Sequence, residues 1–213
     1  MKARAYGLVG ASAVVLAALA AVTLATRDDA FGQTKVRQIR ELSFEFVGQF
    51  QNSPPGVTPA THTHYGYLSH VRGATAFRGA AENETTALFT FFAGDASTLR
   101  VIANGPLRIV TRVGRLTIYR DPSVDGNFDR PETFRDGVRL LDGEFRQQVV
   151  NNTVTGSFTT FHRVRITSTR PFQVGGRRLQ LGRVGQEFRI AFNGHGAMPG
   201  PPSGYFGGYG VSE

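Results

Sequence analysis

The sequence predicts an all-β domain, a single antiparallel β-barrel or sandwich of about 8 to 10 strands. Apolar and polar residues alternate along most segments from Leu42 onward, which is the period of a half-buried strand. Turn dipeptides and proline-containing loops interrupt these segments every 8 to 15 residues or so, as in sandwiches and barrels. No apolar stripe at helical spacing extends beyond about two turns.

The first 25 residues have the features of an export signal. Lys2 and Arg4 precede an uncharged stretch, 6–25, that ends in small residues of the kind signal peptidase recognises. The alternative is an uncleaved membrane anchor, because the stretch is long enough to span a bilayer. Residues 26–41 are polar and predict a linker. We therefore expect a secreted, periplasmic or cell-surface protein, whose only membrane contact would be an uncleaved N-terminal segment.

Cysteine is absent from the chain. Small exported eukaryotic domains commonly depend on disulfides, whereas this chain is long enough to bury one core without them. These features together are typical of a bacterial exported protein.

The first half of the domain contains five strand candidates. The first begins at Leu42 and ends at loop 51–60, whose consecutive prolines cannot continue a ladder. The others are 62–71, 86–92, 99–103 and 107–120. Asn104-Gly105 predicts a hairpin before the last of them, and Gly114 within it predicts a bulge or bend.

The second half contains five more candidates, at 138–141, 144–150, 156–168, 178–181 and 188–192. Asp142-Gly143 predicts a hairpin between the first two. The core is expected to be rich in phenylalanine, of which the chain has 17. We place the domain at 42–193, followed by a Gly/Pro/aromatic tail at 194–213. That tail is either a flexible terminus or a segment that covers the barrel mouth or contacts a partner.

The net charge of +8 does not by itself predict nucleic-acid binding. Twenty-two of the 24 basic residues are arginines, and they are spread along the whole chain. A nucleic-acid-binding protein more often gathers its basic residues in one patch with interleaved aromatic residues. Nucleic acid is therefore not expected as a partner.

No catalytic constellation is recognisable. Thiol nucleophiles are excluded by the absence of cysteine, and neither a nucleophile elbow nor a phosphate-binding glycine loop occurs. Only the general strand pattern is shared with lipocalins and with allene-oxide-cyclase-like or dirigent-like barrels, which is an analogy of fold. The sequence thus favours a protein that binds a small apolar or extended ligand or a surface partner protein. A cyclase or isomerase acting on an apolar substrate and a structural or adhesive surface protein remain the alternatives.

The polar residues proposed for the barrel mouth are His62, His64, Arg163 and Arg165. Residues at i and i+2 of a strand project from one face, so His62 and His64 are also the best candidates for a transition-metal site. Zinc requires at least three protein ligands, and the sequence does not identify a third. Polar residues at the start of a strand are the simpler interpretation.

The segment 121–132, DPSVDGNFDRPE, predicts either a calcium loop or a solvent-exposed hairpin tip. Its oxygen ligands would be Asp121, Ser123, Asp125, Asp129 and Glu132, spaced as in a twelve-residue Ca²⁺ loop. The flanks argue against helices on either side, since a strand precedes the segment and a proline lies near its end. Asp-Gly also recurs nearby as an ordinary turn dipeptide.

Overall fold

The computed structural model describes residues 35–54, 56–57, 60–196 and 203–212. Within these ranges the chain forms eleven strands and one short 3₁₀ helix, and no α-helix. The predicted export signal at 1–25 lies outside the described residues. Among the residues described, no helix is both long enough and apolar enough to cross a membrane.

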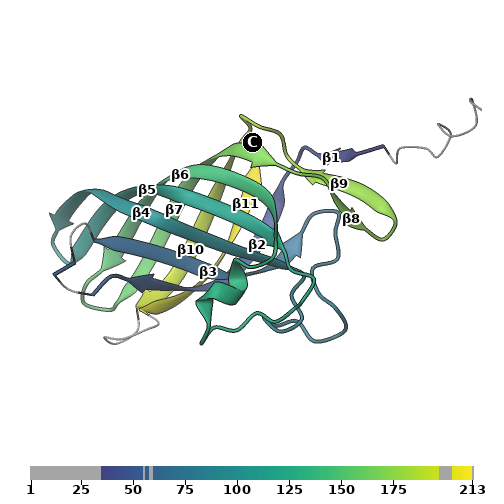
Figure 1. Ribbon diagram of the computed structural model, residues 1–213. Coiled ribbons are helices and arrows are strands. Elements are labelled where there is room, and N and C mark those ends of the chain that lie inside the picture. The colour runs from purple at the N-terminus through teal and green to yellow at the C-terminus, as the bar shows by residue number, and fades with distance from the viewer. Residues whose placement is uncertain (1–34, 55, 58–59, 197–202, 213) are drawn as a thin grey trace, which may run out of the picture. The chain divides into compact units, whose positions relative to one another are not determined.

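Eight strands form a closed barrel, which confirms the predicted fold class in its barrel form (Figure 1). Their order around the barrel is β10-β11-β2-β3-β4-β5-β6-β7, and every neighbouring pair is antiparallel. The strands are β2 (Ser43–Asn52), β3 (Thr61–Val71), β4 (Phe89–Asn104), β5 (Leu107–Arg120), β6 (Val138–Asn152), β7 (Ser157–Thr169), β10 (Glu187–Gly196) and β11 (Gly204–Ser212). Closure leaves the barrel without an unpaired edge strand.

A small second sheet packs against one end of the barrel. It contains β1 (Arg37–Ile39), β9 (Arg177–Leu181) and β8 (Phe172–Val174), in that order. Leu179 and Leu181 belong to the same buried cluster as the barrel phenylalanines. The sheet therefore closes this end, and its first strand lies in a segment that we expected to be a linker.

Inside the barrel, phenylalanine fills the half next to the small sheet. Several of its buried phenylalanines meet edge to face, such as Phe44 with Phe188 and Phe46 with Phe91. Burying one such side chain contributes about 2 kcal/mol, so this half is the main source of stability.

One predicted hairpin and one predicted break between strands need correction. The segments 86–92 and 99–103, predicted as two strands, both overlap a single strand, β4, which begins at Phe89 and is irregular between Gly94 and Arg100. Likewise, Asp142-Gly143 lies within the single strand β6, at a shift in its register with β7. A Cβ on Gly143 would lie 2.6 Å from Val164 Cγ1, so this glycine allows close packing inside a strand rather than a turn.

The C-terminal segment expected to lie outside the barrel supplies its closing strand. Strand β11 pairs with β10 on one side and β2 on the other. Two of its glycines are needed for contact with the neighbouring strand: a Cβ on Gly208 would lie 2.0 Å from the carbonyl oxygen of Ala191, and one on Gly204 would lie 2.4 Å from that of His195. Glycine in this strand therefore reflects close approach rather than flexibility.

An aromatic layer covers the outside of β3. Tyr65 stacks on Phe134 of the 3₁₀ helix η1 (Pro131–Phe134), and Phe128 packs against the same ring. Tyr67 meets Phe77 of the loop between β3 and β4 edge to face. The loop between β5 and β6, which contains the predicted calcium segment, is thereby fixed to the barrel wall.

Candidate functional site

A cavity of about 880 Å³ occupies the half of the barrel that phenylalanine does not fill. It lies at the end where β2 joins β3, β4 joins β5, β6 joins β7 and β10 joins β11. Apolar lining comes mainly from Phe50, Val110, Val149 and Phe158. A cavity of this size is typical of small-molecule sites, and barrel mouths are a common place for them.

A pair of histidines lies on the wall of the cavity. His62 and His64 are buried on β3, and their Nε2 atoms are 2.7 Å apart. The Nδ1–H of His62 donates to Asn52 Oδ1 at 2.6 Å, so His62 Nε2 accepts a hydrogen bond from His64 Nε2–H. This arrangement leaves His64 Nδ1 as an acceptor with no partner among the described residues.

A third buried histidine, His162 of β7, lies beside the pair. Its ring centroid is 5.7 Å from that of His64 and 5.1 Å from those of Phe145 and Phe192. Burial, and then the positive charge of Arg112, lowers the pKa of His162 to about 3. Burial is also the largest cause that lowers the pKa of His62 and of His64 well below the usual value. All three imidazoles are neutral at pH 7.

The positive charge of the cavity comes from two arginines on β5. Arg112 and Arg108 both line it, and no acidic residue is among the described lining residues. Burial, and then repulsion from Arg108, lowers the pKa of Arg112 to about 10, so its side chain stays charged at neutral pH. Its Nε has no hydrogen-bond partner among the described residues. Neither side-chain amide atom of the neighbouring buried Gln147 has one.

The structure places the four predicted mouth residues on different faces. His62 and His64 line the cavity, whereas Arg163 and Arg165 are exposed on the outside of β7. Arg163 Nε donates to Glu187 Oε2 of the adjacent strand at 2.6 Å. The reason is strand periodicity: both arginines alternate with the inward-facing His162, Val164 and Ile166.

Sequence reasoning missed the residues that supply the cavity's remaining polar groups, although periodicity could have found them. On β5 the buried Leu116 and Ile118 mark the inner face, and the same parity leads to Arg112 and Arg108. On β6 the buried Phe145 leads in the same way to Gln147. A signal for these polar residues was therefore present in the alternation.

The histidines do not form a three-residue metal site. His70, which shares a strand with His62 and His64, is exposed near the other end of β3. Among the described side chains, the one group of three or more His, Asp or Glu residues with converging ligand atoms is Asp121, Asp125 and Asp136. The Nε2 atoms of His62 and His64 are already bonded to each other, so a hydrogen-bonded pair describes them better than a zinc centre.

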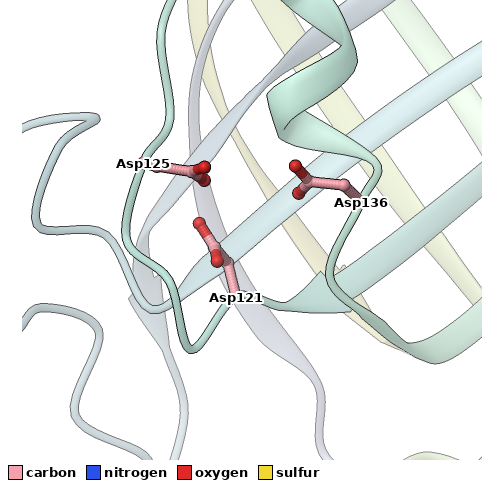
Figure 2. Close-up of side chains that lie close together, drawn as sticks. All are labelled: Asp121, Asp125 and Asp136. Atoms are coloured by element: carbon pink, nitrogen blue, oxygen red, sulfur yellow. The ribbon is translucent and has the colours of Figure 1, made fainter.

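The predicted calcium segment contributes two members of that acidic group (Figure 2). Asp121 and Asp125 converge with Asp136, which lies beyond the predicted segment. Asp129 and Glu132 are exposed and do not belong to the group. The backbone N–H of Ser123, also predicted as a ligand, donates to Asp121 Oδ1.

Comparisons with protein-family models, curated proteins and solved structures give no match for this chain. The functional conclusions below therefore depend on the geometry, burial and charge of the cavity. Fold alone would not decide the function in any case, because one barrel architecture serves many unrelated activities.

Proposed function

We propose that the protein binds a small organic molecule with an apolar body and an anionic headgroup in the open half of its barrel. The observation that carries this proposal is the cavity, in which apolar walls surround arginine and amide groups without protein partners. An exported location, which the N-terminal segment predicts, would give such a protein access to ligands outside the cytoplasm.

The charge balance favours an anion. Arg112 and Arg108 line the cavity, and the three buried histidines add no positive charge at pH 7 because their pKa values are lowered. Guanidinium groups bind carboxylates and similar anions through paired hydrogen bonds. A carboxylate near the partly buried Arg112 would gain attraction without displacing a protein carboxylate.

The unpartnered polar atoms favour a headgroup with several acceptors and at least one donor or bridging water. Arg112 Nε and Gln147 Nε2 are donors, while Gln147 Oε1 and His64 Nδ1 are acceptors. A buried polar group without a partner costs about 1–3 kcal/mol. A bound headgroup that paired with these atoms would recover part of that cost.

The valines and phenylalanines of the lining favour an apolar body. Phe50 and Phe158 meet edge to face with ring centroids 5.3 Å apart, and Val110 and Val149 are cross-strand partners on β5 and β6. Transferring a chain or ring from water to such walls is favourable by about 0.8 kcal/mol for each buried methylene. The expected ligand is therefore amphipathic, for example a medium-chain carboxylate.

Isothermal titration with dodecanoate and with uncharged dodecanol tests this proposal. We expect dodecanoate to bind more tightly than dodecanol, and Arg112→Gln to weaken dodecanoate binding about tenfold or more while changing dodecanol little. Arg146→Gln is the matched control, because Arg146 is exposed on the outside of the adjacent strand β6. Equal binding of both compounds, or equal losses in the two variants, would contradict the proposal.

A proton-transfer enzyme of the isomerase or cyclase type is a second candidate, and the His62–His64 pair favours it. A neutral imidazole with a free lone pair, such as His64 Nδ1, is a suitable general base beside an apolar substrate. His64→Gln would then abolish turnover of a bound ligand without abolishing its binding. If bound ligands are recovered unchanged from the wild-type protein, the enzymatic version fails and the binding version stands.

A further inference from the structure

Three carboxylates converge in the loop between β5 and β6, at the opposite end of β5 from the cavity mouth. One oxygen from each of Asp121, Asp125 and Asp136 lies within 4.8 Å of the other two. None of the ion pairs formed by described residues includes these three aspartates. Three like charges at this separation repel one another unless a cation or a proton lies among them.

Asp121 shows that the group is more than a cluster of surface acids. Its side chain is 0% exposed, and its Oδ1 accepts hydrogen bonds from the backbone N–H groups of Ser123 and Val124. Its Oδ2 is buried and has no hydrogen-bond partner among the described residues. Figure 2 shows the carboxylates of Asp125 and Asp136 facing each other, with that of Asp121 directed toward Asp125. Leaving a fully buried carboxylate oxygen without a donor is costly, and a cation bound at that oxygen would offset the cost.

The nearby arginines do not supply that partner. Arg78 donates to the carbonyl oxygen of Pro122, and Arg120 donates to that of Leu88 while its guanidinium lies 5.1 Å from the centre of the Phe89 ring. Arg78 therefore holds the loop through its backbone, whereas Arg120 bonds the residue before β4 and interacts with Asp121 only through its charge. Neither arginine forms an ion pair with the three carboxylates. Desolvation, and then the charges of Asp125 and Asp121, raises the pKa of the exposed Asp136.

We propose that Asp121, Asp125 and Asp136 bind a Ca²⁺ ion that holds the β5–β6 loop against the barrel. Carboxylate oxygens are hard ligands, and the group contains no histidine or cysteine to favour a transition metal. Ca²⁺ accepts six to eight oxygens in variable geometry, so water and backbone oxygens complete its shell. Mg²⁺ requires a tighter octahedron and is the weaker candidate.

The three aspartates differ from the ligands of a linear twelve-residue Ca²⁺ loop, and the difference indicates what the bound ion would do. Asp121 directly follows β5, whereas Asp136 comes just before β6, so one ion would join both ends of the loop. Between them lie Phe128 and Phe134, which pack on Tyr65 outside the barrel. The ion would thus stabilise the fold on the outer wall, independently of ligand binding in the cavity.

Thermal unfolding of the full protein in EDTA, CaCl₂ or MgCl₂ tests the site. At a calcium concentration about a hundredfold above the dissociation constant, the melting temperature should rise by roughly 5–10 °C, with a smaller rise in magnesium. Asp136→Asn should weaken calcium binding, measured by titration calorimetry, about tenfold or more. Because this change removes like-charge repulsion, the variant should be no less stable than the wild type in EDTA.

Glu132→Gln is the matched control, because a linear loop would use Glu132 as its last ligand whereas the three-aspartate site does not. Retention of the calcium shift in Glu132→Gln and its loss in Asp136→Asn would establish the site. A wild-type melting temperature that does not change between EDTA and calcium would overturn the proposal. A loss in Glu132→Gln as large as that in Asp136→Asn would overturn the assignment of the ligands.

Discussion

The Nε2 atoms of His62 and His64 are joined by a 2.7 Å hydrogen bond inside the barrel, and one proton serves both rings at that contact. Asn52 fixes the proton on the far side of His62. Adding a proton to His64 would place a charged N–H at Nδ1, which has no partner among the described residues. The pair is therefore a neutral element of the cavity wall, in agreement with the lowered pKa of both rings.

The buried histidines predict a loss of stability in mild acid. Each has a pKa near 6.5 in the unfolded chain and a lower one in the folded protein, about 3 for His162. As pH falls below 6.5, the unfolded state takes up protons that the folded state does not bind. The free energy of unfolding should then fall by up to about 1.4 kcal/mol per pH unit for each such histidine, until the folded pKa is reached.

Urea unfolding between pH 7.5 and pH 4 measures this effect. His162→Leu places an apolar, non-titrating side chain between Phe145 and Phe192, and should reduce the slope by up to about 1.4 kcal/mol per pH unit. His70→Gln, which changes an exposed histidine on the same barrel, is the matched control. Parallel curves for His162→Leu and the wild type would contradict the neutral, buried state of His162.

The close approach of β11 to β10 predicts that alanine substitutions at two adjacent glycines will differ in their effect on stability. Gly208→Ala places a methyl group 2.0 Å from the carbonyl oxygen of Ala191 and 2.6 Å from the Phe192 ring. This overlap should lower the free energy of unfolding by about 2–3 kcal/mol. At Gly207 the nearest atom to an added Cβ, the carbonyl oxygen of Phe46, is 3.7 Å away, so Gly207→Ala should be nearly neutral.

Chemical denaturation of the two variants measures the difference directly. Equal stability of Gly208→Ala and Gly207→Ala would mean that β11 does not pack against β10 as described. A loss at Gly208 alone would confirm that the glycine-rich C-terminal segment is a structural strand of the barrel.

The fold class could be predicted from the sequence because strand periodicity is a local signal. The alternation in 156–168, for example, places His162, Val164 and Ile166 on the inner face, where the structure has them. Local signals failed where packing between strands decides the conformation. Asp142-Gly143 has the composition of a turn, but it lies within β6 because Gly143 permits contact with Val164.

The candidate sites were predicted only in part, for a related reason. His62 and His64 are two residues apart, so their shared face follows from periodicity alone. The convergence of Arg112 with the histidines depends on barrel closure, and that of Asp136 with Asp121 depends on the path of a loop. Neither of these two convergences can be calculated from the spacing of the residues along the chain.

The central claim, that the open half of the barrel binds an amphipathic anion, is tested most directly by methyl NMR during a dodecanoate titration. The methyl groups of Val110 and Val149 line the cavity, whereas those of Ile118 and Ile190 are buried in the phenylalanine-filled half. We predict large, saturable shifts for the two valines and small ones for the two isoleucines. An absence of shifts at saturating dodecanoate, or shifts confined to exposed residues such as Val184, would contradict the account.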